Sequence, residues 1–205
     1  MALVSGGREY LSRLVRSDED GLLAEVLETA GADREPSARV TLYCAVVKKE
    51  NFELIVQKAT EIGVAEIVPV ISRRTVKLSV RMERSRTIAR EAAEQSGRNS
   101  LPTLAEPCDL AAALRSAAAN GRNWFFDPAG DALSPADLAV TEQRRLGIFI
   151  GPEGGWDPEE LAAARRAGCR AANLGRLVLR AETAAIAACY LACWPPIGQA
   201  GPAPA

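Results

Sequence analysis

The stretch LGIFIGPEGGWDPEELAAA at positions 146–164 passes from an apolar run through a glycine-rich turn into a helical pattern. An apolar run of this length is typical of a buried strand, and Asp157 followed by Pro158 is typical of a helix start. In open α/β sheets, ligands bind outside the carboxyl ends of the strands. The stretch therefore predicts a strand, a ligand loop and a helix in that order.

The rest of the chain repeats this alternation. Further strands are predicted at 39–47, 65–71, 123–127 and 169–174, and further helices at 51–63, 82–96 and 181–194. Gly63 is expected to end the first of these helices. Pro69 lies inside a strand pattern, which favours an edge or a bulge there. The pattern predicts an α/β fold with a mainly parallel sheet.

The composition excludes several classes of enzyme. The chain has 205 residues and no histidine, which argues against Ser-His-Asp and Cys-His nucleophilic sites and against most zinc sites. Its five cysteines lack CxxC spacing and are expected to be reduced thiols in the core, with no metal bound. No stretch is long and apolar enough to span a bilayer, and the first residues do not resemble a secretory signal, so a cytoplasmic location is expected.

Positive charge is concentrated in the segment 73–98. Three of its residues are acidic, and eight are basic: Arg73, Arg74, Lys77, Arg81, Arg84, Arg86, Arg90 and Arg98. A solvated helix face with local Arg–Glu pairs would explain part of this excess. The remainder is typical of a surface that binds phosphates, which predicts a nucleic-acid partner.

The charges of the glycine-rich loop indicate which ligand it could take. A phosphate cradle would present bare backbone N–H groups, whereas Glu153, Asp157, Glu159 and Glu160 would repel an anion. A second glycine turn, NLGRLVLRAETA at 173–184, also leads into a helix. Two such loops could form a slot for a flat, uncharged or cationic ligand, although tight turns and helix caps without any ligand remain the alternative.

Four motifs taken together resemble the RsmE family of ribosomal RNA methyltransferases in the SPOUT superfamily. They are KATEIGV (58–64), EAAEQSGR (91–98), IGPEGGW (150–156) and LGRLVLRAETA (174–184), and the resemblance covers about 39–194. It implies a SPOUT-type parallel sheet with a C-terminal deep trefoil knot, S-adenosyl-L-methionine as the cofactor, a homodimer, and methylation of N3 of one uridine in small-subunit (16S) ribosomal RNA. A deep knot is an exception to the usual rule against threaded chains.

The resemblance also implies roles for particular residues. The residues expected to bind the cofactor are Phe126, Asp127, Ile150, Gly151, Pro152, Gly154, Gly155, Leu174, Gly175, Leu177, Leu179 and Thr183. Arg180 and Arg98 are candidates for stabilising the uridine anion, and Glu153 or Glu182 for accepting its proton. Contacts with ribosomal RNA are expected from Lys48, Lys49, Lys58, Arg73, Arg74 and Arg98.

The N-terminal region departs from the family pattern. Residues 1–38 hold a hairpin pattern around a DEDG turn, and family members carry a PUA-like barrel about twice as long. We expect a partial RNA-binding module at 1–38, the methyltransferase domain at 39–194 and a disordered tail at 195–205. Two alternatives stay open: a methyltransferase of this class acting on another RNA, and an RNA-binding module inactive through loss of half the barrel.

Overall fold

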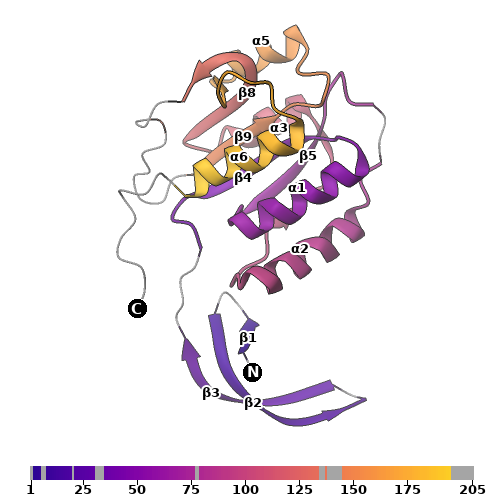
Figure 1. Ribbon diagram of the computed structural model, residues 1–205, viewed down its shortest axis with the longest axis vertical. Coiled ribbons are helices and arrows are strands. Elements are labelled where there is room, and N and C mark those ends of the chain that lie inside the picture. Colours follow the sequence, from indigo (N-terminus) through magenta and orange to yellow (C-terminus); the bar gives the residue numbers. More distant parts are fainter. Residues whose placement is uncertain are drawn as a thin grey trace.

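The computed structural model describes residues 2–5, 8–19, 21–30, 35–76, 79–133, 137 and 145–194. Lys77 and the tail predicted at 195–205 lie outside these residues. Figure 1 shows an α/β body with a separate three-stranded sheet below it. The body carries the predicted alternation of strands and helices.

The body is built on one parallel sheet. Its strands are β4 (Arg39–Ala45), β5 (Glu66–Ile71), β6 (Thr103–Leu104), β7 (Cys108–Asp109), β8 (Arg122–Ala132), β9 (Arg145–Ile150) and β10 (Arg170–Asn173). The order is β10-β8-β9-β4-β5-β6, with β7 also paired to β5, and every pair is parallel. The predicted parallel α/β sheet is confirmed.

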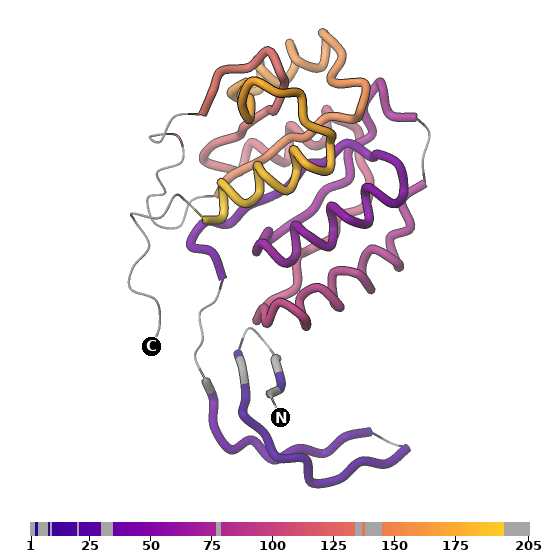
Figure 2. The backbone as a smooth tube through the Cα atoms, in the orientation of Figure 1, coloured from indigo at the N-terminus to yellow at the C-terminus, as the bar shows by residue number. Residues whose placement is uncertain are grey.

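Helices cover both faces of this sheet. They are α1 (Lys49–Ile62), α2 (Met82–Ser96), α3 (Leu110–Ala117), α5 (Pro158–Arg166) and α6 (Ala181–Cys193). One core cluster joins α1, α2 and α6 to the sheet, and the other joins α3 and α5 to it. Helix α1 ends at Gly63 in the left-handed conformation, as its sequence predicted. Figure 2 traces the chain from the edge strand β10 back across the sheet to α6, which packs against β4, β9 and α1.

Pro69 lies in β5 at a place that explains how a proline fits there. It is opposite Cys44 of β4. On its other side, β6 pairs with β5 only as far as Ile67, and β7 begins at Val70. The Ile67 carbonyl accepts from Ala105 on the β6 side, so the nitrogen of Pro69, two residues on, points to that same side. It therefore faces the gap between the two short strands, where no ladder hydrogen bond is lost.

The segment 101–117 carries elements that the sequence pattern did not predict. Strands β6 and β7 have two residues each, which is too short for a recognisable period. Helix α3 starts where the Asp109 side chain accepts a hydrogen bond from Ala112 N at 2.7 Å. An N-cap aspartate is the one signal there that could have predicted it.

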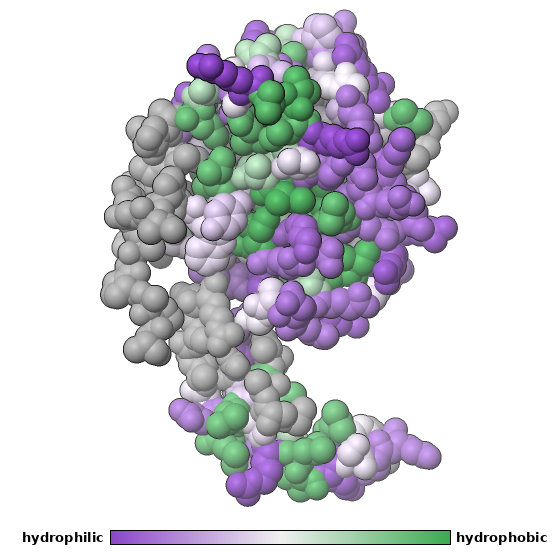
Figure 3. All heavy atoms as spheres, in the orientation of Figure 1, coloured by the Kyte–Doolittle hydropathy of each residue, from purple (hydrophilic) through white to green (hydrophobic). Residues whose placement is uncertain are grey.

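The described residues of the N-terminal sheet contribute to neither core cluster. It consists of β1 (Ala2–Ser5), β2 (Arg8–Asp18) and β3 (Gly21–Ala30), joined antiparallel. The predicted hairpin is confirmed, with longer strands and a third strand added. Its residues Leu14, Leu22 and Val26 are about half exposed or more. Figure 3 shows apolar side chains on the surface of this sheet.

Candidate cofactor site

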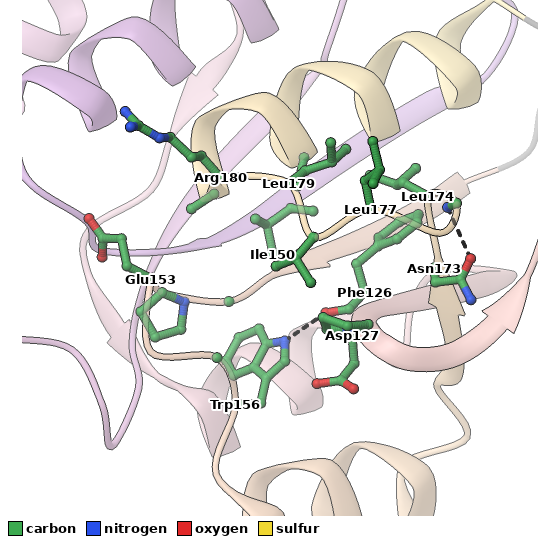
Figure 4. A pocket seen from close by; sticks show the side chains of 18 residues that line it. Phe126, Asp127, Ile150, Glu153, Trp156, Asn173, Leu174, Leu177, Leu179 and Arg180 are labelled. Carbon is green, nitrogen blue, oxygen red and sulfur yellow. Dashed lines mark hydrogen bonds between the residues drawn. The ribbon is translucent and has the colours of Figure 1, made fainter.

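A cavity of about 320 Å³ opens at the carboxyl ends of β9 and β10 and beside the middle of β8. Its wall is predominantly apolar, with Asp127, Glu153, Asn173 and Arg180 supplying polar side chains. Figure 4 shows Glu153 and Arg180 at one end, Asn173 and Leu174 at the other, and Ile150 with Leu179 between them. The two glycine loops thus meet across one space, as the sequence predicted.

The first loop is a tight turn closed by its own backbone. The amide of Gly155 donates to the Pro152 carbonyl at 2.8 Å, and Gly155 adopts φ 68°, a conformation that favours glycine. Gly151 is small for a different reason, because a Cβ there would lie 3.0 Å from Nε1 of Trp156. The turn leaves Glu153 exposed at the mouth of the cavity.

Trp156 forms part of the cavity wall and was missed by the sequence analysis. Its indole is buried, donates to the Phe126 carbonyl at 3.1 Å and packs against Phe125 with ring centroids 4.3 Å apart and ring planes tilted by 35°. The available signal was the unusual tryptophan directly after GPEGG. Asn173 was also missed, and its amide donates to Gly130 O at 2.6 Å.

The second loop presents both backbone and leucines to the cavity. Gly175 adopts φ 122°, and its amide donates to Oδ1 of Asn173 at 3.0 Å. Leu177 and Val178 line the cavity, yet they are 81% and 80% exposed. This loop therefore closes only one side of the space within a single chain.

Most acids of the first loop cap a helix rather than face the cavity. The Asp157 side chain accepts from Glu159 N at 3.0 Å, and Asp157 N donates to Glu160 Oε2 at 2.9 Å, so both form a capping box on α5. Glu160 is buried and also accepts from the amide of Arg73 at 2.9 Å. Glu153 is the only one of the four loop carboxylates that lines the cavity.

Two of the four catalytic candidates line the cavity, namely Arg180 and Glu153. Glu182 lies in the first turn of α6, outside the lining, with its Oε2 buried and without a hydrogen-bond partner. Arg98 lies elsewhere. It donates to both carboxylate oxygens of Glu35, at 3.2 and 2.6 Å, and to two backbone carbonyls at the end of α1.

The expected cofactor residues lie at the cavity with two exceptions. Those that line it are Phe126, Asp127, Ile150, Gly151, Pro152, Gly155, Leu174, Gly175, Leu177 and Leu179. Thr183 is exposed on α6 and outside the lining. Gly154 faces away, because a Cβ there would meet the side chain of Arg74 at 3.6 Å. Gly155 is therefore the glycine of this pair that both faces the cavity and has positive φ.

The cysteine beneath the loop is unsuited to nucleophilic chemistry. Burial and, to a smaller extent, the nearby Glu153 carboxylate together raise the pKa of Cys44 to about 12. Its thiol therefore stays protonated at neutral pH. All five cysteines are free, as expected.

The arginines of segment 73–98 have partners that the sequence analysis did not consider. Arg73 pairs with Asp157 and Glu159, Arg74 donates to the Gly154 carbonyl, Arg86 pairs with Glu83 and Glu106, and Arg98 pairs with Glu35. On α1, Lys58 and Lys49 contact Glu61 and Glu53, while Lys48 is exposed. Pairing therefore absorbs more of the excess charge than the sequence suggested, because most of the partners of these four arginines lie outside the segment.

The described part of the chain has neither a metal-binding cluster of side chains nor a membrane-spanning helix. Within it, His, Cys, Asp and Glu side chains form no group of three or more that could hold a metal ion. No described helix combines the length and apolarity needed to cross a bilayer.

Comparisons with known proteins agree on one family. The model of the RNA methyltransferase domain matches residues 33–192. Ribosomal RNA small subunit methyltransferase E of Mesomycoplasma hyopneumoniae is 34% identical over 187 residues, which cover 86% of this chain and 78% of that protein. The protein of the same name from Synechocystis is 34% identical, over 90% of this chain and 62% of its own length.

A solved structure extends this agreement to the fold. The ribosomal RNA small subunit methyltransferase E of Neisseria gonorrhoeae, bound to S-adenosyl methionine, has a TM-score of 0.77 and 30% identity, covering 92% of this chain and 80% of that one. The family model spans most of the chain, and the Mesomycoplasma relative is matched over more than two thirds of its length. The chain therefore belongs to the ribosomal RNA small subunit methyltransferase E family of RNA methyltransferases.

Proposed function

We propose that the chain is an S-adenosyl-L-methionine-dependent methyltransferase that methylates N3 of a uridine in small-subunit (16S) ribosomal RNA. One observation carries this proposal: the GPEGG and LGRLVL loops form a single cavity with Glu153 and Arg180 at the same end. Family membership supports the cofactor, the enzyme class and the RNA substrate. The position of the methylated atom rests on the family resemblance.

The cavity fits the cofactor in shape and charge. Its apolar walls suit an adenine ring, and the backbone is accessible at Gly155 and Gly175, where no side chain intervenes. S-adenosyl-L-methionine supplies an electrophilic methyl group on a cationic sulfur. A carboxylate at the mouth, Glu153, is compatible with that cation, whereas an anionic ligand would be repelled. The carboxylate at the centre of this glycine loop therefore suits a cationic ligand.

The polar pair at the cavity has two distinct roles in this proposal. Arg180 stabilises the negative charge that uridine acquires when N3 loses its proton, and Glu153 accepts that proton. Glu182 is a less direct candidate, since it lies outside the lining. Methyl transfer then depends mainly on alignment of the two reactants, which the two loops provide.

The finer features of the fold are part of the same proposal. A deep trefoil knot is supported by the path of the chain, which leaves the edge strand β10 and returns over β4 and β9 as α6. We assign 39–194 to the methyltransferase domain and 1–38 to a partial PUA-like module that contributes to RNA binding. The family model begins at residue 33, which agrees with this boundary to within a few residues.

The active form in this proposal is a homodimer. Leu177 and Val178 are almost fully exposed, and Tyr190 on α6 and Trp194 directly after it are 57% and 42% exposed. Such exposure beside the cavity is typical of an interface between subunits. A second copy over this face would also close the open side of the site.

We assign RNA binding to basic side chains near the carboxyl ends of the sheet strands and on α2. Lys48, Arg81 and Arg90 are exposed, and none has an ion pair among the described residues. Arg73, Arg74, Lys49 and Lys58 have partners within the chain, so they contribute less free charge than the sequence suggested. A cytoplasmic location stays a prediction of the sequence.

The test has two parts. Calorimetry with S-adenosyl-L-methionine measures cofactor binding directly, and incubation with small ribosomal subunits lacking the modification, followed by mass spectrometry of nucleosides, measures 3-methyluridine. We expect binding and one methyl group per subunit. Binding with methylation of a different RNA would favour the first alternative, and RNA binding without cofactor binding would favour the inactive module.

A further inference from the structure

The loop after β5 contacts the GPEGG turn through one arginine. Nη1 of Arg74 donates to the Gly154 carbonyl at 2.8 Å, and its Nη2 lies 4.0 Å from Oδ2 of Asp157. Strand β4 separates β5 from β9, so no strand pairing joins these two loops. The guanidinium therefore links two segments that lie 80 residues apart in sequence.

The turn has little else to hold its outer side. Its internal hydrogen bond runs from Gly155 N to Pro152 O, and both Glu153 and Gly154 are exposed. A Cβ at Gly154 would find only Cβ and Cδ of Arg74 within 4 Å. Among the described residues, the side chain of Arg74 is thus what packs against this side of the turn. The opposite side of the turn faces the cavity through Glu153 and Gly155.

We propose that Arg74 is a positioning residue for the cofactor site. It fixes the Gly154 carbonyl, and through it the positions of Glu153 and Gly155, without lining the cavity itself. This inference rests on the proposed function, because it takes the cavity to be the site for S-adenosyl-L-methionine. It also separates Arg74 from the phosphate contacts expected from its charge alone.

The sign of the effect distinguishes positioning from electrostatics. S-adenosyl-L-methionine carries a net positive charge near neutral pH, so an arginine that acted only through its field would weaken binding, and its removal would tighten it. A positioning role predicts the opposite, since loss of the hydrogen bond leaves the turn less ordered before binding. The two roles therefore give opposite changes in affinity.

The first experiment is calorimetry with S-adenosyl-L-methionine in the absence of RNA. We expect Arg74→Ala to weaken binding roughly five- to tenfold, the scale of one net hydrogen bond. Arg74→Lys keeps a donor and the charge, and should recover part of the loss. Arg115→Ala removes the same charge from an exposed position on α3 without touching the turn, and should bind within about twofold of the parent chain.

The second experiment needs no cofactor. Hydrogen exchange of the Gly155 amide reports whether the turn opens, and Arg74→Ala should speed it roughly five- to tenfold while Arg115→Ala leaves it unchanged. Unchanged or tighter cofactor binding by Arg74→Ala would overturn the inference, whatever the exchange rate. Unchanged exchange would overturn it as well. If the parent chain itself failed to bind the cofactor, the proposed function would fall instead, and the exchange rates would still decide whether Arg74 orders the turn.

Discussion

The two glycine loops and the arginine-rich segment 73–98 differ in how their geometry is determined. Each loop joins a strand to the helix that follows it in sequence, β9 to α5 and β10 to α6. The arginines of the segment are paired mainly with carboxylates from other parts of the chain, such as Glu35, Glu106 and Glu159. Local patterns therefore predicted the loops well, and a local count of charges overestimated the free positive charge of the segment.

The largest expected effect is on stability, and it tests Arg98, the buried residue at the end of segment 73–98. Arg98→Ala removes a guanidinium that is 6% exposed, and with it the hydrogen bonds to Glu35 and to the carbonyls of Thr60 and Val64. We expect the free energy of unfolding to fall by about 3 kcal/mol in urea titrations. Arg90→Ala is the control and should change it by less than about 0.5 kcal/mol.

A catalytic role for Arg98 would give a different result. Methyl transfer would then fall sharply while the unfolding free energy stayed near that of the parent chain. That outcome would assign Arg98 a catalytic role like that proposed for Arg180, instead of a structural one.

The next effect tests the cavity itself. Arg180→Ala should lower methyl transfer by roughly 100- to 1000-fold, the scale of losing one donor to a developing anion. Cofactor affinity, measured by calorimetry, should stay within a few fold because the two loops remain in place. A large loss of affinity with unchanged turnover of bound complex would instead assign Arg180 to cofactor binding.

A smaller effect compares the two adjacent glycines. Gly155→Ala has open space for its methyl group but must adopt φ 68°, which costs about 1–2 kcal/mol. Gly154→Ala meets only ordinary contacts with Arg74 and needs no positive φ. We expect cofactor affinity to fall roughly tenfold for the first variant and about twofold or less for the second. Equal effects would show that the turn responds as a whole rather than through Gly155.

The smallest effect concerns RNA. Replacing both Arg81 and Arg90 by alanine should weaken RNA binding and reduce the slope of log affinity against log salt by about 2, if each contacts one phosphate. Arg86→Ala is the matched control, because Arg86 is already paired with Glu83 and Glu106. A steeper loss for Arg86→Ala would show that its intramolecular pairs open when RNA binds.

Much of the body was predictable because its signals are short-range. Each of these signals depends on a few neighbouring residues. They are the apolar runs of β4 and β9, the apolar face of α1, and Asp157–Pro158 at the start of α5. Strands β6 and β7 were not predictable, since two residues carry no period.

The candidate site also has some features that short-range signals predicted and others that they did not. Gly155 and Gly175 were predicted at the site from the glycine-rich turns that carry them, and both line the cavity. Gly154 faces away from the cavity toward Arg74, which comes from another loop. Trp156 was missed because its role comes from packing under Gly151 and Phe126. A local sequence pattern does not indicate which side chains far apart in the sequence become partners.

The sheet order has a consequence for synthesis of the chain. Leu42 of β4 pairs with Ile67 of β5 on one side, but on the other with Ile148 of β9, about a hundred residues later. A ribosome adding about 5–20 residues per second leaves that edge of β4 unpaired for roughly 5–20 s. During this time the nascent chain carries an open, apolar edge at its centre, which is the kind of surface that chaperones recognise and that favours aggregation. Truncated chains that end before β9 should therefore be the form of this protein most prone to aggregate.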